Sequence, residues 1–354
     1  MADMDRIAGY GTADSRTDAR GAVTPRAALL VLGVLLLHLA FIASYLGALH
    51  DPEPDRVPLA VVAPDDIRGE LVGRLDGLPG GPLDAGHRAK DAADARRQVE
   101  RRDVDGALIV DPTSITDTLY VASGGGSSLA QALTEVIREA EAAEGRSVTV
   151  EDVVPAGDGD SRGLSSFYLI VGWCVGGYLC AAALAISAGA RPATAGRAVR
   201  RLILLGVYSV LAGLAGAVIA GPVLDALPGR VAALAGLGAL VVFATGALTL
   251  ALQGLLGIVG IGVALLLVVV LGNPSAGGPY PYPLLPPFWQ AVGPALIPGA
   301  GTWVARSIAY FDGRDVLGPL LVLAAWAIAG AALTVLFARV RGGPRSSLDE
   351  LSFH

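Results

Sequence analysis

The sequence predicts an α-helical polytopic membrane protein of six transmembrane helices, with a small extracytoplasmic α/β domain inserted between the first and second helices. Apolar residues make up 53% of the 354 positions and charged residues only 16%, against roughly 25% in ordinary soluble domains. The mean hydropathy is +0.58. The charges also gather in one segment, 51–162, which holds 23 acidic and 12 basic residues. One acidic soluble part and a long apolar remainder together predict this fold class.

The first predicted span is Ala27–Leu49, which contains no Asp, Glu, Lys or Arg. As a helix, its 23 residues extend about 34 Å, which is enough to cross the hydrocarbon core. A cleaved signal peptide is the alternative interpretation. The apolar core of a signal peptide is usually about 7–15 residues long and precedes a small-x-small cleavage site, so the longer apolar run here favours a membrane span. Five further spans follow: Gly163–Ala190, Leu202–Leu224, Val231–Leu252, Leu255–Leu271 and Val316–Ala338, with Gln253-Gly254 dividing the third from the fourth.

The orientation of these spans is predicted by the arginines of the short loops, because cytoplasmic loops carry an excess of Lys and Arg. Eleven arginines lie on the side of the N-terminus: Arg6, Arg16, Arg20, Arg26, Arg191, Arg197, Arg200, Arg201, Arg339, Arg341 and Arg345. Three lie on the other side: Arg230, Arg306 and Arg314. Both termini are therefore predicted to be cytoplasmic. The boundaries are a tail 1–26, the helix 27–49, the extracytoplasmic domain 50–162, a five-helix domain 163–340 and a tail 341–354.

The inserted domain alternates between two patterns. Short apolar runs predict strands, and apolar residues at helical spacing predict helices. We expect strands at Val57–Ala63, Gly106–Val110, Leu119–Ala122 and Val148–Val154, helices at Asp65–Leu75, Asp91–Arg102 and Ser127–Ala143, and a Pro/Gly-rich break at Leu78–Gly86. This alternation is typical of a small α/β domain.

Motifs of the common catalytic classes are missing from the sequence. A phosphate-binding loop of the form GxxxxGK[ST] needs a lysine, and the only lysine, Lys90, is followed by Asp91. No HExxH or GxSxG motif and no Cys/His cluster occurs, and Cys174 and Cys180 both lie within one apolar run. We therefore expect no enzymatic activity, no cofactor, no metal site and no nucleic-acid partner. We expect the apolar helices of the chain to contact the lipid bilayer.

Two polar residues lie at or within the predicted spans. His38 is midway along the first span, and an ionisable group at that depth is by default a candidate proton carrier or substrate contact. The alternative, which we favour, is a neutral imidazole hydrogen-bonded to a neighbouring helix, because no intramembrane Asp or Glu is available to partner it. Gln253 fits a polar turn residue better than a ligand.

The most distinctive segment is Gly272–Gly313, which we call the outer segment. It is apolar, but it is too rich in proline for a plain span, since proline removes helix hydrogen bonds. Irregular backbone at membrane depth is tolerated only where protein covers it or where it lines a cavity. We therefore interpret the segment as a re-entrant or interfacial gate on the outer face. Its candidate gate residues are Gly272, Asn273, Pro274, Gly277, Gly278, Pro286, Trp289, Pro298, Arg306 and Tyr310.

The chain resembles the type-2 ABC exporter permeases, in particular the phage-infection-protein-like (YhgE/Pip-like) proteins of bacterial plasma membranes. The resemblance rests on GNPSAGG, LLPPFW, LIPG and YFDG within the outer segment, and on one span followed by a large outer domain and the remaining spans. It implies a homodimeric permease on which a separate ATPase docks from the cytoplasm. The implied ATPase contact is Ala190–Arg201, with the arginines Arg191, Arg197, Arg200 and Arg201.

The sequence thus leads to two functional hypotheses. The first is a permease subunit of an ABC-type exporter that moves an amphiphilic or envelope-related substrate with energy from another chain. The second is a non-transporting envelope scaffold, secretion accessory or phage-receptor-like protein that acts through residues 50–162.

Overall fold

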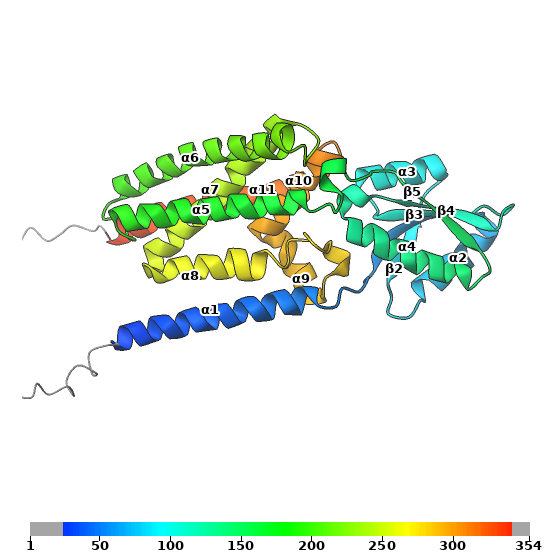
Figure 1. Cartoon of the computed structure of the whole chain (residues 1–354), viewed down its shortest axis with the longest axis horizontal. Helices are drawn as coiled ribbons and strands as arrows, with labels where there is room; N and C mark the ends of the chain where they lie inside the picture. Colours follow the sequence, from blue (N-terminus) through cyan, green and yellow to red (C-terminus); the bar gives the residue numbers. More distant parts are fainter. Residues whose placement is uncertain (1–23, 342–354) are drawn as a thin grey trace, which may run out of the picture.

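A computed structural model describes residues 24–341, which form two parts lying end to end (Figure 1). One part is a bundle of apolar helices. The other is an α/β unit, which we define as residues 57–152, at one end of the bundle. Most of the predicted tails 1–26 and 341–354, including Arg6, Arg16, Arg20 and Arg345, lies outside the described residues.

Within residues 24–341, five helices are long and apolar enough to cross a membrane. They are consistent with the polytopic membrane protein that the composition predicts. Their bounds are α1 Pro25–Leu49, α5 Ser165–Ala188, α6 Ala195–Val218, α7 Val231–Leu256 and α11 Leu317–Arg341. A π-helical turn, Ile219–Val223, extends α6.

The predicted span Leu255–Leu271 corresponds to a shorter helix. Helix α7 continues through Gln253-Gly254 and ends before Gly257, whose φ of +67° favours glycine. The next helix consists of α8 (Val259–Leu265) and a π-helical segment, Leu266–Gly272, of seven residues each. Together they extend about 21 Å, which is less than the roughly 30 Å of the hydrocarbon core. This helix is therefore too short to cross the hydrocarbon core by itself.

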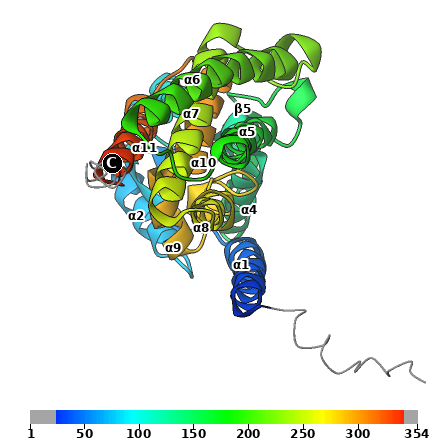
Figure 2. The ribbon, with the colours of Figure 1, turned by 90° about the vertical axis from the view of Figure 1, so that its left-hand side faces the viewer.

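Helix α7 forms the centre of the bundle and packs against α5, α6 and α11 (Figure 2). Glycines on the neighbouring helices permit this close approach. A Cβ placed on Gly177 of α5 would lie 2.6 Å from the carbonyl oxygen of Val242, and one placed on Gly213 of α6 would lie 2.5 Å from that of Ala235. Small residues at such contacts allow helices in a bilayer to pack backbone against backbone.

Helix α1 lies apart from the bundle over most of its length (Figure 2). Only 6% of its most apolar window is buried. Its main contact within the bundle is the π-helical segment Leu266–Gly272, and its C-terminal end is anchored where Ala48 packs against Leu285 and Trp289 of the outer segment. The helix is therefore attached next to the α/β unit and exposed along the rest of its length.

The α/β unit contains a five-stranded sheet with the order β2-β1-β3-β4-β5. Its pairs are parallel except for β3 and β4, which are antiparallel. The strands are β1 Val57–Val62, β2 Leu83–Arg88, β3 Gly106–Ile109, β4 Thr116–Val121 and β5 Ser147–Asp152. The helices are α2 Asp65–Asp76, α3 Ala92–Arg101 and α4 Ser127–Ala142.

The two faces of the sheet have separate cores, because successive side chains of a strand point to opposite faces. Helices α2 and α4 cover the face that carries the larger side chains, where Leu59, Leu108 and Leu119 of the strands share a core with Leu133 and Ile137 of α4. Helix α3 covers the other face, where Ala60, Ala95, Val99 and Ala107 are buried. The strand and helix patterns expected from the sequence coincide with these elements except at one place.

That exception is β2, which overlaps the stretch Leu78–Gly86 that was expected to break the pattern. The break covers only the turn before Leu83, and the strand continues to Arg88. The strand has few apolar residues because it lies at the edge of the sheet and pairs only with β1. An edge strand half covered by protein does not produce the alternation that marks an interior strand.

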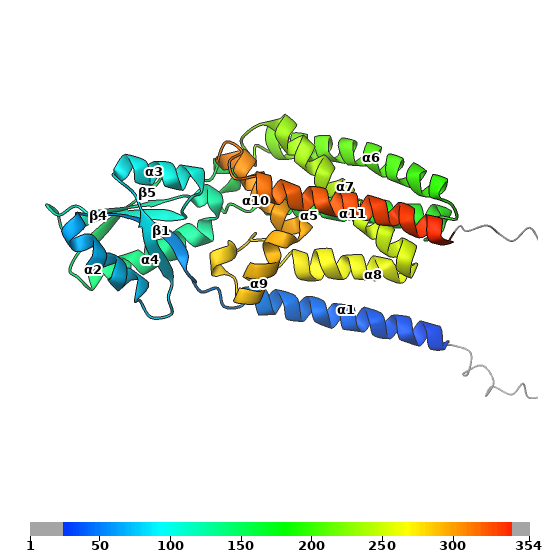
Figure 3. The same cartoon turned by 180° about the vertical axis from the view of Figure 1, so that it is seen from behind.

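The outer segment lies between the bundle and the α/β unit (Figure 3). It contains two short helices, α9 (Pro287–Val292) and α10 (Ile297–Tyr310), and two single turns of 3₁₀-helix, Tyr282–Leu284 and Gly293–Ala295. Helix α10 packs against α5, α7 and α11. The segment therefore covers the end of the bundle that faces the sheet.

The close contact at Gly177 and the open space at Gly172 predict that a valine destabilises the bundle at only the first of these two positions of α5. Gly177→Val should lower the stability of the bundle by about 1–3 kcal/mol, because the added atoms force α5 away from α7. Gly172→Val is the matched control, since a Cβ at Gly172 meets no atom within 4 Å. Thermal unfolding of both variants in the same detergent measures the difference, and equal melting temperatures would contradict the packing described.

Candidate functional site

Arg306 of α10 holds the outer segment together. Its side chain is 4% exposed and donates hydrogen bonds from Nη1 to the carbonyl of Gly277 at 2.5 Å and from Nη2 to that of Gly278 at 2.7 Å. A third bond, of 3.2 Å, goes from Nη2 to the carbonyl of Gly163, just before α5. Gly277 has a φ of +68°, a conformation that favours glycine. One guanidinium thus joins α10, the 277–278 turn and the start of α5.

The first residues of the outer segment form a tight, buried turn. Gly272 packs against Pro298, since a Cβ at Gly272 would lie 2.7 Å from the proline Cγ. Asn273 and Pro274 follow it in the turn and are buried, and no described residue donates a hydrogen bond to the Oδ1 of Asn273. The Ser275 hydroxyl donates to the carbonyl of Leu271 at 2.7 Å. Gly272 and Pro298, both predicted gate residues, therefore meet where the π-helical segment contacts α10, and Asn273 and Pro274 lie in the turn that follows.

The remaining predicted gate residues lie at two other contacts. Pro286 precedes α9, and Trp289 of that helix packs against the end of α1. Tyr310, at the end of α10, donates its hydroxyl to the Oδ2 of Asp160 at 2.6 Å, and Asp160 Oδ1 accepts the Ser165 amide of α5. The structure thus spreads the candidate gate over the whole end of the bundle rather than gathering it around one opening.

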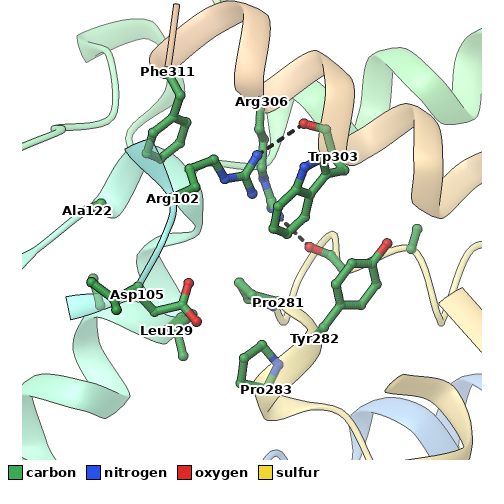
Figure 4. A pocket seen from close by; sticks show the side chains of 15 residues that line it. Arg102, Asp105, Ala122, Leu129, Pro281, Tyr282, Pro283, Trp303, Arg306 and Phe311 are labelled. Atoms are coloured by element: carbon green, nitrogen blue, oxygen red, sulfur yellow. Dashed lines mark hydrogen bonds between the residues drawn. The ribbon is translucent and has the colours of Figure 1, made fainter. Parts of the chain in front are cut away.

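The outer segment meets the α/β unit at a stacked arginine (Figure 4). Arg102, the residue that follows α3, has its guanidinium carbon 3.4 Å from the ring centre of Trp303 and 4.7 Å from that of Phe311. Its Nη1 donates to the Ser307 hydroxyl at 2.6 Å and to the Trp303 carbonyl at 3.3 Å. The ring of Tyr282 stacks on the far side of Trp303, with centroids 6.0 Å apart. Cation–π contacts of this kind are strongest where water is excluded.

Beside this stack lies a cavity of about 190 Å³, which we call the junction cavity. Its walls come from the α/β unit and from the outer segment, and most of them are apolar. They include Val104, Leu129, Pro281, Pro283 and Phe311, while Arg102, Asp105 and Arg306 supply the charges. Figure 4 shows the Asp105 carboxylate pointing into the cavity, opposite the prolines. None of the described residues donates a hydrogen bond to this carboxylate.

The surroundings of the junction cavity disfavour charge. Burial raises the pKa of Asp105 from 3.8 to about 6, and the positive charges of Arg102 and His87 oppose this shift only in part. Burial likewise lowers the pKa of Arg102 to about 9, assisted by the nearby charge of Arg306. No carboxylate among residues 24–341 lies within 4.0 Å of either guanidinium. The cavity therefore contains two arginines without a direct counter-charge.

At the opposite end of the bundle, the four predicted ATPase-contact arginines divide into two pairs. Arg201 is buried and donates from Nη2 to the carbonyls of Ala188 and Gly189, both at 2.7 Å. Arg191 lies against Gly257 in the α7–α8 turn. Arg197 and Arg200 are exposed on the first turns of α6. Arg191 and Arg201 thus contact the neighbouring loops, whereas the exposed side chains of Arg197 and Arg200 are accessible to another molecule.

The two polar residues of the spans lie far from the junction cavity. His38 is exposed on α1, and within the described part of the chain its ring has no hydrogen-bond partner. Gln253 is fully buried within α7, and its Nε2 donates to the carbonyl of Ala181 in α5 at 3.3 Å. The interpretation of Gln253 as a turn residue was wrong, because the turn begins only at Gly257, where the backbone conformation changes.

Sequence reasoning singled out Gly277 and Arg306 but missed Arg102 and Asp105, the other charged residues of the junction cavity. Arg102 and Trp303 are 201 positions apart, and the local pattern around Arg102 is that of any charged helix end. Trp303 and Phe311 are aromatic residues of an apolar segment, and nothing in the sequence relates them to Arg102. The one available signal was an arginine followed by Asp103 and Asp105 just before a buried strand, and many surface loops share this signal.

The arginine stack predicts a loss of stability at the contact between the two parts. Arg102→Met should cost about 2 kcal/mol, because it removes the desolvated cation–π contact and the bond to Ser307. Arg101→Met is the matched control, since Arg101 is the neighbouring residue and is exposed. Hydrogen exchange of α10 amides should increase in the first variant and remain unchanged in the second. Equal exchange in both variants would contradict the stack.

The raised pKa of Asp105 predicts that the stability of the protein depends on pH. Its pKa is higher in the folded chain than in the unfolded chain, so the folded state binds more protons between about pH 4 and 6. The stabilising contribution of the neutral carboxyl is full below pH 4 and is lost as the pH rises through 6. Asp105→Asn should therefore stabilise the protein by about 1–2 kcal/mol at pH 7.5, after allowance for solvent screening, and hardly at all at pH 4.

The control for this change is Asp103→Asn, since Asp103 is exposed two residues away. Thermal unfolding of both variants at pH 4 and pH 7.5 measures the effect. A stabilisation by Asp105→Asn that is equal at the two pH values would show that the carboxyl does not titrate in this range.

Comparison of the chain with protein-family models, with curated proteins and with solved structures found no match. The function must therefore be inferred from the arrangement of these residues.

Proposed function

We propose that the chain is the membrane permease subunit of an ABC-type exporter in the plasma membrane of a bacterium, and that it moves an amphiphilic or envelope-related substrate. The observation that supports this most is the outer segment. It covers one end of the helix bundle with short helices and turns held by Arg306. Irregular backbone of this kind lines a pathway in transporters, and a simple membrane anchor has no need of it.

The direction of the helices supports the orientation that the arginines predict. Helices α1, α6 and α8 run toward the α/β unit, and α5, α7 and α11 run away from it (Figures 1 and 3). Both ends of the described chain thus lie at the end of the bundle away from the sheet. In this proposal, that end is cytoplasmic, the α/β unit is outside, and α8 with the outer segment makes the sixth passage.

A lipid-facing groove supports an amphiphilic substrate. It lies between α1 and α8, has a volume of about 700 Å³ and is lined by apolar residues, among them Leu30, Val34, Leu37, Ile258 and Leu266. Such a groove suits an acyl chain that enters from the bilayer. The exposed face of α1 also supports the homodimer, because a second copy could cover apolar surface that the first copy leaves open.

In this proposal the energy comes from another chain, since the only lysine, Lys90, is not part of a phosphate-binding loop. The exposed Arg197 and Arg200 offer a positive surface for that chain. The segment Ala190–Arg201 contains no acidic residue to neutralise them. An ATPase with an acidic docking surface fits this charge.

The proposal predicts that Arg197→Glu combined with Arg200→Glu abolishes export. Like charges across the interface repel, so the amount of co-purified ATPase should fall at least tenfold, and ATP-dependent uptake of a fluorescent amphiphile by inside-out vesicles should fall to background. Arg138→Glu is the control, because Arg138 is an equally exposed arginine on α4. Both variants should insert in the membrane at the level of the unchanged protein.

The proposal is wrong if no ATPase co-purifies with the full chain and if deletion of the chain leaves ATP-dependent uptake unchanged. Binding of the full chain to an envelope component under those conditions would instead support a non-transporting scaffold or receptor.

A further inference from the structure

The junction cavity presents donor groups that no described residue uses. The Nη1 of Arg102 is engaged by Trp303 and Ser307, whereas its Nη2 and Nε have no partner among residues 24–341. The Nε of Arg306 is buried and also lacks a partner. The Arg306 Nε is enclosed by protein, whereas Arg102 is half-buried at the wall of the cavity, and its unused Nη2 and Nε donors are open to a ligand that supplies acceptors.

The sign of the charges favours an anion. Two guanidinium groups face the cavity and one carboxylate does, and the arginines repel one another. Apart from Arg306 and Asp105, the titratable groups that influence the pKa of Arg102 are Asp315 and Tyr282. Tyr282 belongs to the outer segment, and Asp315 follows it in the chain. An anion placed between the two arginines would relieve their repulsion, since charge-assisted bonds to guanidinium are among the strongest in proteins.

The shape of the cavity favours an apolar body behind the anionic group. Its volume of about 190 Å³ equals roughly six water molecules, which is more than a lone inorganic anion needs. The walls opposite the arginines are formed by Leu129, Pro281 and Pro283, which offer no hydrogen-bond donors to a free ion. A short alkyl chain would fill this space.

One carboxylate opposes such a ligand. Asp105 points into the same cavity (Figure 4), and its negative charge would repel an incoming anion. The conflict disappears if the carboxyl is protonated, because it then donates a hydrogen bond to the anion instead of repelling it. The charged groups that face it are Arg102, at the end of α3, and His87, in β2.

We propose that the junction cavity binds the anionic head group of an amphiphile through Arg102 and Arg306, and that Asp105 takes up one proton when the amphiphile binds. The site is thus an anion site coupled to proton uptake. The identification of this amphiphile with an exported substrate rests on the proposed function, whereas its binding does not. The binding can therefore be measured without an ATPase, so that its failure and a failure of export are separate results.

The pKa of Asp105 sets the pH range of the effect. The carboxyl is about half protonated near pH 6 in the free protein, and a bound anion raises this pKa further. The affinity should therefore be nearly constant below pH 5 and should fall about tenfold for each pH unit above 6, because each binding event then requires the uptake of a proton.

The test uses the full chain in lipid nanodiscs and the probe hexanesulfonate, which stays anionic over the whole range from pH 4.5 to 8.5. Titration calorimetry in buffers of different ionisation enthalpy should show binding that weakens above pH 6, with about one proton taken up at pH 7.5. Hexyltrimethylammonium and inorganic sulfate are the comparison ligands, and empty nanodiscs correct for partition into lipid. Both comparison ligands should bind at least tenfold more weakly than hexanesulfonate.

Four variants identify the groups. Asp105→Asn should bind hexanesulfonate with the same affinity at pH 5 and pH 8, and more than tenfold more tightly than the unchanged protein at pH 8. A misfolded variant cannot produce this gain. Arg102→Gln should lose at least tenfold in affinity at every pH, and its neighbour Arg101→Gln should lose nothing. His87→Gln should retain the pH dependence, which excludes His87 as its source.

Three results would overturn the inference. Tighter binding of the cationic probe would mean that Asp105 is the ligand-binding group. Sulfate that binds as tightly as hexanesulfonate would mean a site for free anions and not for amphiphiles. Hexanesulfonate binding that is absent, or that is unchanged by both Arg102→Gln and Asp105→Asn, would mean that the junction cavity is not the site.

Discussion

The arrangement of the described chain depends on one buried guanidinium. A segment rich in proline and glycine cannot satisfy its own carbonyl groups, because proline has no N–H and the turns leave oxygens without donors. Arg306 supplies the missing donors to Gly277, Gly278 and Gly163. The irregular backbone of the outer segment can therefore lie buried at the end of the bundle. Without this side chain, three carbonyls would be left in an apolar environment.

The α/β unit is joined to the membrane part through the segment that Arg306 holds. Arg102 stacks on Trp303, and the Ser128 hydroxyl donates to the carbonyl of Pro279 at 2.8 Å. Both contacts reach the outer segment rather than the long helices. A displacement of the sheet is therefore transmitted first to α10 and to the 277–282 turn. These contacts connect the α/β unit to the end of the bundle through the outer segment.

Local patterns in the sequence account for most of the fold and for little of the site. The long helices and most of the strands are predictable because apolar periodicity is a property of neighbouring residues. The extent of α7 was less visible, since a buried Gln253 resembles a turn until its contact with Ala181 in α5 is known. Strand β2 was hidden by its edge position. Arg102 and Asp105 could not be found, because their significance arises only from contacts with residues about 200 positions away.

The single attachment of α1 has a consequence for the surrounding lipid. A helix held at the end next to the α/β unit and exposed along most of the rest has few contacts that fix its tilt, so it can adjust its tilt to the thickness of the hydrocarbon layer. A thinner bilayer tilts such a helix further and changes the width of the groove beside α8. The composition of the membrane thereby becomes a physical variable that acts on this protein through hydrophobic mismatch, without any specific lipid being recognised.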